Sequence, residues 1–148
     1  MLVRPASAGD IPPMMRLEQH SATASHWSPE QYDRLFAAMA PRRIALVIEE
    51  QDGVRGFLIA LALAPEWEIE NLAVAADARR RGLGTRLLGE FLDRARAEGA
   101  QAVYLEVRES NHAARALYEK WAFVESGRRV RYYQSPQEDA ITYRHSFA

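Results

Sequence analysis

The segment from Asp77 to Leu88, "DARRRGLGTRLL", constrains the fold more than any other part of the chain. Before it, "WEIENLAV" (Trp67 to Val74) has the alternation of a β-strand. After it, leucine, phenylalanine and alanine residues recur at helical spacing, and Gly99 stands where a C-terminal cap belongs. The sequence therefore predicts a strand, a glycine-containing turn and a helix N-terminus in succession.

Similar patterns predict the other elements, in the order strand, two helices, three strands, helix, strand, helix and two strands. The remaining predicted strands are Leu2 to Ala6, Arg43 to Glu49, Val54 to Leu63, Ala102 to Val107, Phe123 to Tyr133 and Asp139 to Phe147. Asp10, Ser28 and Asn111 are the predicted N-caps of the other helices. This order predicts a mixed α/β domain built on one sheet, with helices packed against its faces.

The second helix has the clearest start signal. Ser28, Pro29 and Gln31 form a capping box with proline at the first helical position. The apolar stripe predicted for this helix consists of Tyr32, Leu35, Phe36 and Met39.

The length of 148 residues predicts one domain, and the net charge of -1 gives no general attraction to nucleic acid or to an anionic membrane. There is no cysteine, and the four histidines show no metal-ligand spacing, so we predict no metal site. We see no signal peptide and no apolar run long enough to span a bilayer. We therefore expect a cytoplasmic protein without nucleic-acid or membrane partners, whose oligomeric state the sequence leaves unknown.

The arginine-glycine turn has the properties of an anion site. The first N–H groups of a helix have no internal partner, and the helix dipole adds positive potential there. Gly82 and Gly84 have no Cβ to keep a phosphate away, and arginines add bidentate donors. A P-loop is excluded by Thr85-Arg86, and a dinucleotide fingerprint by Leu87 at the third glycine position. A solvated helix entry remains the alternative.

These residues resemble a known family. Arg79-Arg80-Arg81-Gly82-Leu83-Gly84 is similar to the Arg/Gln-x-x-Gly-x-Gly/Ala signature of the GCN5-related N-acetyltransferases (GNAT), in the same strand–turn–helix context. The resemblance implies one GNAT-like domain, residues 1–148, with a mixed, mostly antiparallel sheet of about seven strands flanked by four helices. It also implies that acetyl-coenzyme A (acetyl-CoA) is the acyl donor. The implied cofactor-binding residues are Leu72, Ala73 and Val74, Arg79, Arg80 and Arg81, and Gly82, Leu83, Gly84 and Thr85.

In the stretch "YLEVRESNHAARALYEKWAF", alternation sends Leu105 and Val107 to one side of a strand and Tyr104, Glu106 and Arg108 to the other. Glu106 is therefore a candidate buried acid. The alternative is an edge-strand glutamate that lies in water or pairs with Arg108 or Arg131.

The same stretch, with "HWSPEQY", "IENLAV" and "RYYQSPQEDAI", is similar to the RimI-type enzymes, which acetylate the N-terminal alanine of a ribosomal protein. This resemblance implies that Glu106 is the general base and Tyr118 the general acid. Asn111 would bind the pantetheine arm or help to place Glu106. Spacing alone favours a core aromatic for Tyr118. The family usually has glycine where this chain has Ala122, and a left-handed alanine costs about 1 kcal/mol, so we expect this helix to end differently.

The acceptor side has weaker signals. Glu66, Glu68 and Glu70 share one face of the predicted strand, where they would attract a basic peptide or form a solvated surface. Three aromatic residues, Trp27, Tyr132 and Tyr133, could wall a peptide groove or belong to the core.

The favoured activity is transfer of an acetyl group from acetyl-CoA to the N-terminal α-amine of a ribosomal protein. An α-amine has a pKa near ~8 and a lysine amine near ~10.4, so a glutamate base deprotonates the α-amine more easily. The alternatives are acetylation of a small-molecule amine or another protein's N-terminus, and a non-catalytic acyl-CoA-binding sensor.

Overall fold

The computed structural model describes residues 1–20, 27–78, 81–134 and 136–147. Its strands are β1 (Leu2–Pro5), β2 (Arg43–Glu50), β3 (Gly53–Leu63), β4 (Glu66–Val74), β5 (Ala102–Arg108), β6 (Val124–Gln134) and β7 (Gln137–Ser146). Its α-helices are α1 (Ile11–Gln19), α2 (Pro29–Arg34), α3 (Leu83–Ala97) and α4 (His112–Lys120), and short 3-10 turns span Ala8–Asp10 and Ala76–Ala78. This order confirms the predicted α/β domain. In the described ranges, no helix is both long and apolar enough to cross a membrane.

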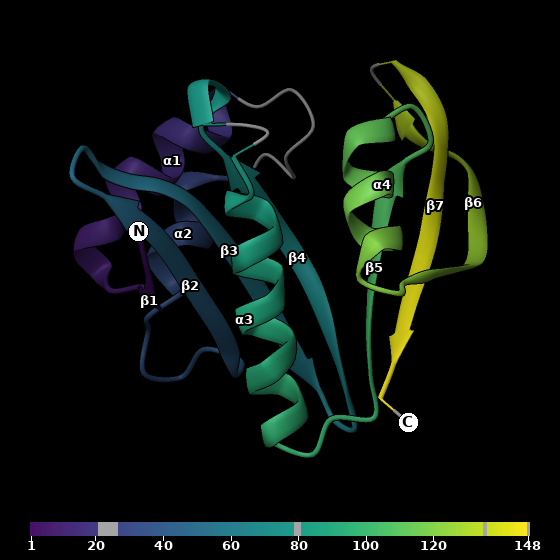
Figure 1. Ribbon diagram of the computed structural model, residues 1–148, viewed down its shortest axis with the longest axis horizontal. Helices are drawn as coiled ribbons and strands as arrows, with labels where there is room; N and C mark the ends of the chain where they lie inside the picture. The colour runs from purple at the N-terminus through teal and green to yellow at the C-terminus, as the bar shows by residue number, and fades with distance from the viewer. Residues whose placement is uncertain (21–26, 79–80, 135, 148) are drawn as a thin grey trace.

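The strands form one seven-stranded sheet in the order β1-β2-β3-β4-β5-β7-β6. Every neighbouring pair is antiparallel except β4 and β5, which run parallel. The sheet is therefore mixed and mostly antiparallel, as expected. Figure 1 shows α3 and α4 on one face of the sheet and α1 and α2 behind it.

The parallel pairing of β4 with β5 is short. It joins Glu66–Glu68 to Ala102–Tyr104 and then stops, although β4 continues to Val74 and β5 to Arg108. Figure 1 shows the two strands diverging, with β1 to β4 and α3 on one side and β5 to β7 and α4 on the other. The sheet is consequently open at its centre on one end.

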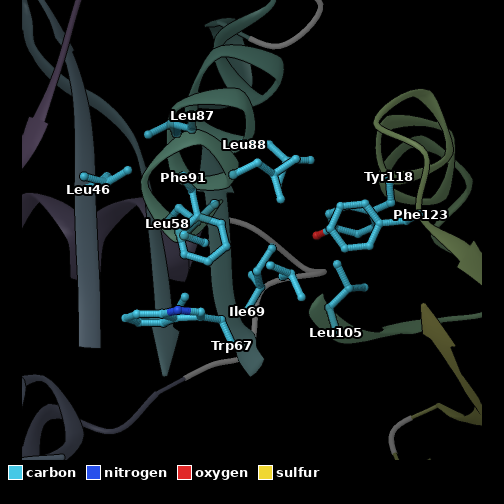
Figure 2. Close-up of a cluster of buried hydrophobic side chains, with 14 of the residues drawn as sticks. Leu46, Leu58, Trp67, Ile69, Leu87, Leu88, Phe91, Leu105, Tyr118 and Phe123 are labelled. Carbon is cyan, nitrogen blue, oxygen red and sulfur yellow. The ribbon is translucent and has the colours of Figure 1, made fainter. Parts of the chain in front are cut away.

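Helix α3 is held on the sheet by an unbroken apolar stripe. Its buried residues are Leu83, Leu87, Leu88, Phe91, Leu92 and Ala95. They pack with Leu58 on β3 and with Trp67 and Ile69 on β4, and the Trp67 and Phe91 rings meet edge to face at 6.0 Å (Figure 2). A stripe this wide fixes the rotation of α3 about its axis, and thereby the place where its N-terminus points.

A β-bulge lies in the middle of β4. Ile59 pairs with Asn71 and Ala60 with Ile69, so Glu70 is an extra residue on β4. Beyond the bulge the alternation changes: Asn71 and Ala73 face α1, whereas Ile69 faces α3. A bulge bends its strand, which accords with the divergence of β4 from β5.

The stripe predicted for the second helix is wrong in its second half. Helix α2 ends at Arg34, and Phe36 and Met39 are 40% and 96% exposed instead of continuing the buried stripe of Tyr32 and Leu35. Two turns with hydrogen bonds between residues three apart replace the helix there. The Ala37 N–H donates to the Arg34 carbonyl and the Ala40 N–H to the Ala37 carbonyl, both at 3.1 Å.

Asp10 stands at the N-cap position of α1, but its side chain does not cap that helix. Its carboxylate accepts from Arg4 (2.8 Å) and from the Ser7 N–H (2.8 Å), and the Arg4 guanidinium holds the pKa of Asp10 below its ordinary value. A charged partner within reach therefore outcompetes the orphan N–H groups of the helix.

The expected departure at the end of α4 is also wrong. Ala122 takes the left-handed conformation, with φ of 64°. The Phe123 N–H donates to the Tyr118 carbonyl and the Ala122 N–H to the Glu119 carbonyl, both at 3.0 Å, which is the Schellman pattern. The Phe123 and Tyr118 rings, 5.7 Å apart, add the apolar contact of that motif. Packing and two hydrogen bonds thus impose on alanine the ending that glycine adopts without strain.

We predict that Ala122→Gly stabilises the protein by about 1 kcal/mol, because it relieves the left-handed strain. The expected rise in melting temperature is roughly 2–4 °C. The control is Ala116→Gly, an exposed position inside α4, which should destabilise the protein by about 1 kcal/mol. Equal effects of the two substitutions on thermal unfolding would contradict the assignment of strain to Ala122.

Candidate active site

A cleft of about 1230 Å³ opens where β4 and β5 separate. Ordinary small-molecule pockets measure roughly 300–1,000 Å³, so this cleft has room for a large, extended ligand. It is lined by β4 from Glu68 to Val74, by β5 from Leu105 to Arg108, by the start of α3 and by α4. Because residues of both sheet faces contribute, the cleft runs through the sheet.

The N-terminus of α3 faces this cleft. Gly82 is the N-cap, with φ of +80°, and the Arg86 N–H donates to its carbonyl at 3.0 Å. The N–H groups of Leu83, Gly84 and Thr85 come before that first helical bond, so the helix itself gives them no acceptor. A Cβ on Gly84 would lie 3.4 Å from Leu117 on α4 and 3.7 Å from Val74 on β4, so this turn of α3 lies between those two elements. The helix end therefore presents unpaired N–H groups and the positive end of the helix dipole to the cleft.

The three arginines of the turn are not equivalent. Arg79 and Arg80 lie outside the described residues. Arg81 is half exposed and pairs with Glu50 at the end of β2. Its charge is therefore partly balanced by a carboxylate, and which arginine meets a phosphate stays a prediction.

The edge of β4 that faces the cleft carries backbone donors. The Ala75 N–H donates to the Arg55 carbonyl on the β3 side at 2.8 Å. Successive N–H groups along a strand point to opposite edges, so those of Val74 and Leu72 point to the other edge, which β5 has left. The N–H of Ala73, in contrast, points toward β3. Two of the three predicted backbone groups thus face the cleft.

Tyr118 is both a core residue and a cleft residue. Its ring is buried against Phe123 and Tyr143, with centroids 5.7 and 6.3 Å away. Figure 2 shows its hydroxyl pointing from α4 toward Leu88 and Ile69, across the gap between the two halves of the molecule. Burial raises the pKa of this phenol, and the nearby Tyr133 raises it further, so the group is protonated at neutral pH.

Asn111 caps α4 as expected. Its Oδ1 accepts from the Ala114 N–H at 3.2 Å, and the residue lines the cleft. The amide oxygen is thus engaged with the first turn of α4. The amide NH₂ group remains as a donor that a ligand in the cleft can accept from.

Glu106 lies on β5, on the face opposite Leu105 and Val107, and its side chain is 18% exposed. One oxygen, Oε1, lies 3.2 Å from Nη2 of Arg129 on β6. The other, Oε2, is buried and has no hydrogen-bond partner within the part of the chain that the structure describes. Glu106 is thus half-buried, with one oxygen shielded from water, and not a fully buried acid as predicted. The alternative pairing with Arg108 or Arg131 is wrong.

The arginines of that alternative have other partners. Arg108 lies 3.5 Å from Glu138 and stacks 4.1 Å from the centre of the Tyr133 ring. Asp139 accepts the backbone N–H of Arg131 at 2.8 Å. Both contacts draw these residues toward the β6–β7 hairpin and away from Glu106.

The acidic row on β4 shares one face, as predicted, but its members differ. Glu66 pairs with Arg144, and Glu70 with Arg43 at 2.7 Å. Burial raises the pKa of Glu68 above its ordinary value, and the charges of Glu70 and Glu106 raise it further. Within the described residues, Glu68 is therefore the member of this row that makes no ion pair, whereas Glu106 on the neighbouring strand is paired with Arg129.

The three predicted wall residues also line the cleft. Tyr132 and Tyr133 meet edge to face at 5.2 Å, and Trp27 packs 5.5 Å from the Tyr32 ring at the start of α2. Trp27 thus packs against the core under α2 and also lines the cleft. Among the described residues, no cluster of three or more His, Asp and Glu could hold a metal ion.

Sequence reasoning missed a buried polar group next to the cleft. Glu18 on α1 is only 4% exposed, and its Oε1 accepts from the Trp27 N–H and from the Asn71 amide, both at 2.7 Å. It therefore joins α1, the start of α2 and the bulged part of β4. Its position four residues after Met14, on the apolar stripe of α1, was a signal that could have revealed it.

The comparisons with known proteins agree with this geometry. Residues 11–123 match the model of the acetyltransferase (GNAT) family. The [ribosomal protein bS18]-alanine N-acetyltransferase of Salmonella typhimurium is 37% identical over 137 residues, 91% of this chain and 90% of that protein. The enzyme of the same name from Escherichia coli K12 is 35% identical over 135 residues, 89% of this chain and 88% of that protein.

Solved structures give the same result. The crystal structure of the ribosomal-protein-S18-alanine N-acetyltransferase from Escherichia coli superposes with a TM-score of 0.87 at 30% identity, covering 99% of this chain and 95% of that one. The crystal structure of Ard1 from Thermoplasma volcanium superposes with a TM-score of 0.85 at 26% identity, covering 99% of this chain and 97% of that one.

We predict that Glu18→Ala destabilises the protein by about 2–4 kcal/mol, because it leaves two buried donors unpaired and removes a charge-assisted acceptor. Gln19→Ala, the next residue of α1 and exposed, is the matched control and should change stability by less than about 0.5 kcal/mol. Chemical denaturation measures both. A Glu18→Ala effect as small as that of the control would show that this network does not hold the elements together.

Proposed function

The chain belongs to the acetyltransferase (GNAT) family and is an N-acetyltransferase. We propose that its acceptor is the α-amine of the N-terminal alanine of ribosomal protein bS18. The observation that carries the proposal is the cleft itself, which joins a helix N-terminus, an open strand edge and a half-buried carboxylate. Relatives named for bS18 alanine acetylation, similar over about nine-tenths of both chains, support the acceptor. Residues 1–148 act as one domain in this proposal.

Acetyl-CoA is the donor in this family. In the proposal, the N–H groups of Leu83, Gly84 and Thr85 hold its diphosphate, with support from the turn residues Arg79, Arg80, Arg81 and Gly82. The open edge of β4 binds the pantetheine arm, and the N–H groups of Leu72 and Val74 polarise the thioester carbonyl as an oxyanion hole does. The Asn111 amide donates to the same arm. Each of these groups is a donor, which suits a ligand rich in phosphate and carbonyl oxygens.

The reaction that we propose is direct transfer. The acceptor nitrogen attacks the thioester carbon; a C–N bond forms, and the C–S bond breaks. Glu106 takes, through water, the proton that the ammonium must lose before it attacks. Tyr118 donates a proton to the departing thiolate, and the second proton, which the nitrogen loses after the C–N bond forms, returns to the Tyr118 oxygen through solvent. Holding the two reactants together supplies most of the rate gain, and proton transfer supplies the rest. The high pKa of the Tyr118 phenol keeps its proton available for this step.

The acceptor enters from the face of the sheet that carries the acidic row. Glu68 and Glu106 attract the ammonium, and Glu66 and Glu70, each paired with an arginine, form the border of this surface. Trp27, Tyr132 and Tyr133 wall the peptide. A glutamate base favours an α-amine over a lysine amine because the lysine pKa is about 2.4 units higher, or roughly 3.3 kcal/mol in deprotonation cost.

Mass spectrometry tests the acceptor. We expect acetyl-CoA and the protein to add one acetyl group to the N-terminal peptide of bS18 at its α-amine. The control is the same peptide with a blocked α-amine and its lysines free, which should gain no mass. Acetylation of spermidine or an amino acid without any bS18 product would replace the acceptor by a small amine. Tight acetyl-CoA binding without transfer to any amine would favour a sensor.

Glu106→Gln tests the base. We expect it to bind acetyl-CoA as wild type does and to lose at least about 100-fold in kcat, because a general base contributes roughly 10²–10⁴-fold. Glu125→Gln is the matched control; it removes a carboxylate that pairs with Arg115 (2.8 Å) outside the cleft and should keep full turnover. Equal turnover in Glu106→Gln and wild type would remove Glu106 from the mechanism.

A further inference from the structure

The ion pair between Arg129 and Glu106 connects strands that are not neighbours. β7 lies between β5 and β6, where Thr142 pairs with Glu106 and Ala140 with Arg129. Paired residues of adjacent strands share a face, so both short side chains lie beneath the path of the Arg129 side chain. The arginine therefore reaches across a whole strand to the carboxylate that we propose as the base, and Nη2 and Oε1 are 3.2 Å apart.

The two partners differ greatly in exposure. The Glu106 side chain is 18% exposed, whereas the Arg129 side chain is 59% exposed. An ion pair with one solvated partner is weak, because the arginine regains water when it leaves. Arg129 also lies over the ring of Tyr132, at 5.2 Å from the ring centre, so a cation–π contact remains available to it. The pair can open without burying an uncompensated guanidinium.

The other arginines near the acidic residues are held by different carboxylates. Arg43 bonds Glu70 and Arg144 pairs with Glu66. Arg108 is close to Glu138 and stacks on Tyr133. In the described residues, Arg129 is the cation that pairs with Glu106.

We propose that Arg129 occupies the position beside Glu106 that the acceptor's ammonium takes, so that acceptor binding exchanges one cation for another. This inference rests on the proposed role of Glu106. It makes Arg129 a residue that sets the affinity for charged acceptors: the exchange lowers affinity for every ammonium by the same factor, and an acceptor whose amine carries no charge does not displace the guanidinium.

Steady-state kinetics with the bS18 N-terminal peptide tests the exchange. We expect Arg129→Gln to lower the KM of the peptide roughly two- to fivefold, the range for an ion pair with an exposed partner, and to leave the KM of acetyl-CoA unchanged. Arg129→Lys keeps the cation and should resemble wild type. Arg128→Gln is the matched control; it removes the preceding arginine, which pairs with Asp139 at 2.6 Å and with Glu109, and should leave the KM of the peptide unchanged.

Calorimetry supplies a readout that needs no turnover. The free-amine peptide should bind Arg129→Gln two- to fivefold more tightly than wild type, whereas the N-acetylated peptide, which lacks the ammonium, should bind both equally. A raised or unchanged KM, or an equal gain for both peptides, would overturn the proposal and leave Arg129 as a residue that only orients Glu106. The rate at which the wild-type protein acetylates the peptide tests the proposed function separately. Even if that rate is zero, the calorimetric comparison of the two peptides still tests the exchange of cations.

Discussion

The separation of β4 from β5 after three residue pairs is the feature on which the rest of the structure depends. Continuing the parallel pairing would satisfy the backbone of both strands, so leaving it unfinished exposes donors that need another partner. The bulge at Glu70 bends β4, and the stripe of α3 brings the helix N-terminus to the same opening. In the proposed function, the oxygen acceptors of acetyl-CoA take the place of the missing strand, so the sheet is incomplete where the donor is proposed to bind.

The two faces of the opening have opposite electrostatic character. The start of α3 and the edge of β4 present N–H groups, whereas Glu68 and Glu106 present carboxylates on the side of α1 and α2. In the proposed function, an anionic donor and a cationic acceptor are drawn to different sides of one sheet and meet in the plane between them. Glu18 fixes this arrangement from behind, because it ties Trp27 and Asn71 to α1.

Local chemistry allowed most of the fold to be predicted. Alternation placed Glu106 opposite Leu105, helical spacing defined the buried face of α3, and Gly82 marked the turn, because each pattern reflects backbone geometry over a few residues. The failures have different origins, and only the first depends on a contact distant in sequence. The partner of Glu106 lies 23 residues away on a strand beyond β7, and the left-handed Ala122 is imposed by Phe123 packing on Tyr118. After Arg34 the chain forms turns instead of continuing α2, and its apolar spacing does not encode that change.

The central claim is that backbone amides at the open edge of β4 and the start of α3 bind acetyl-CoA. Amide chemical shifts of the ¹⁵N-labelled protein, titrated with acetyl-CoA, test it residue by residue. The account predicts that the largest shifts belong to Leu72 and Val74 and to Leu83, Gly84 and Thr85, and that amides of the distant β1–β2 pair barely move. Saturable binding with unchanged shifts at these five amides, or no binding at all, would contradict it.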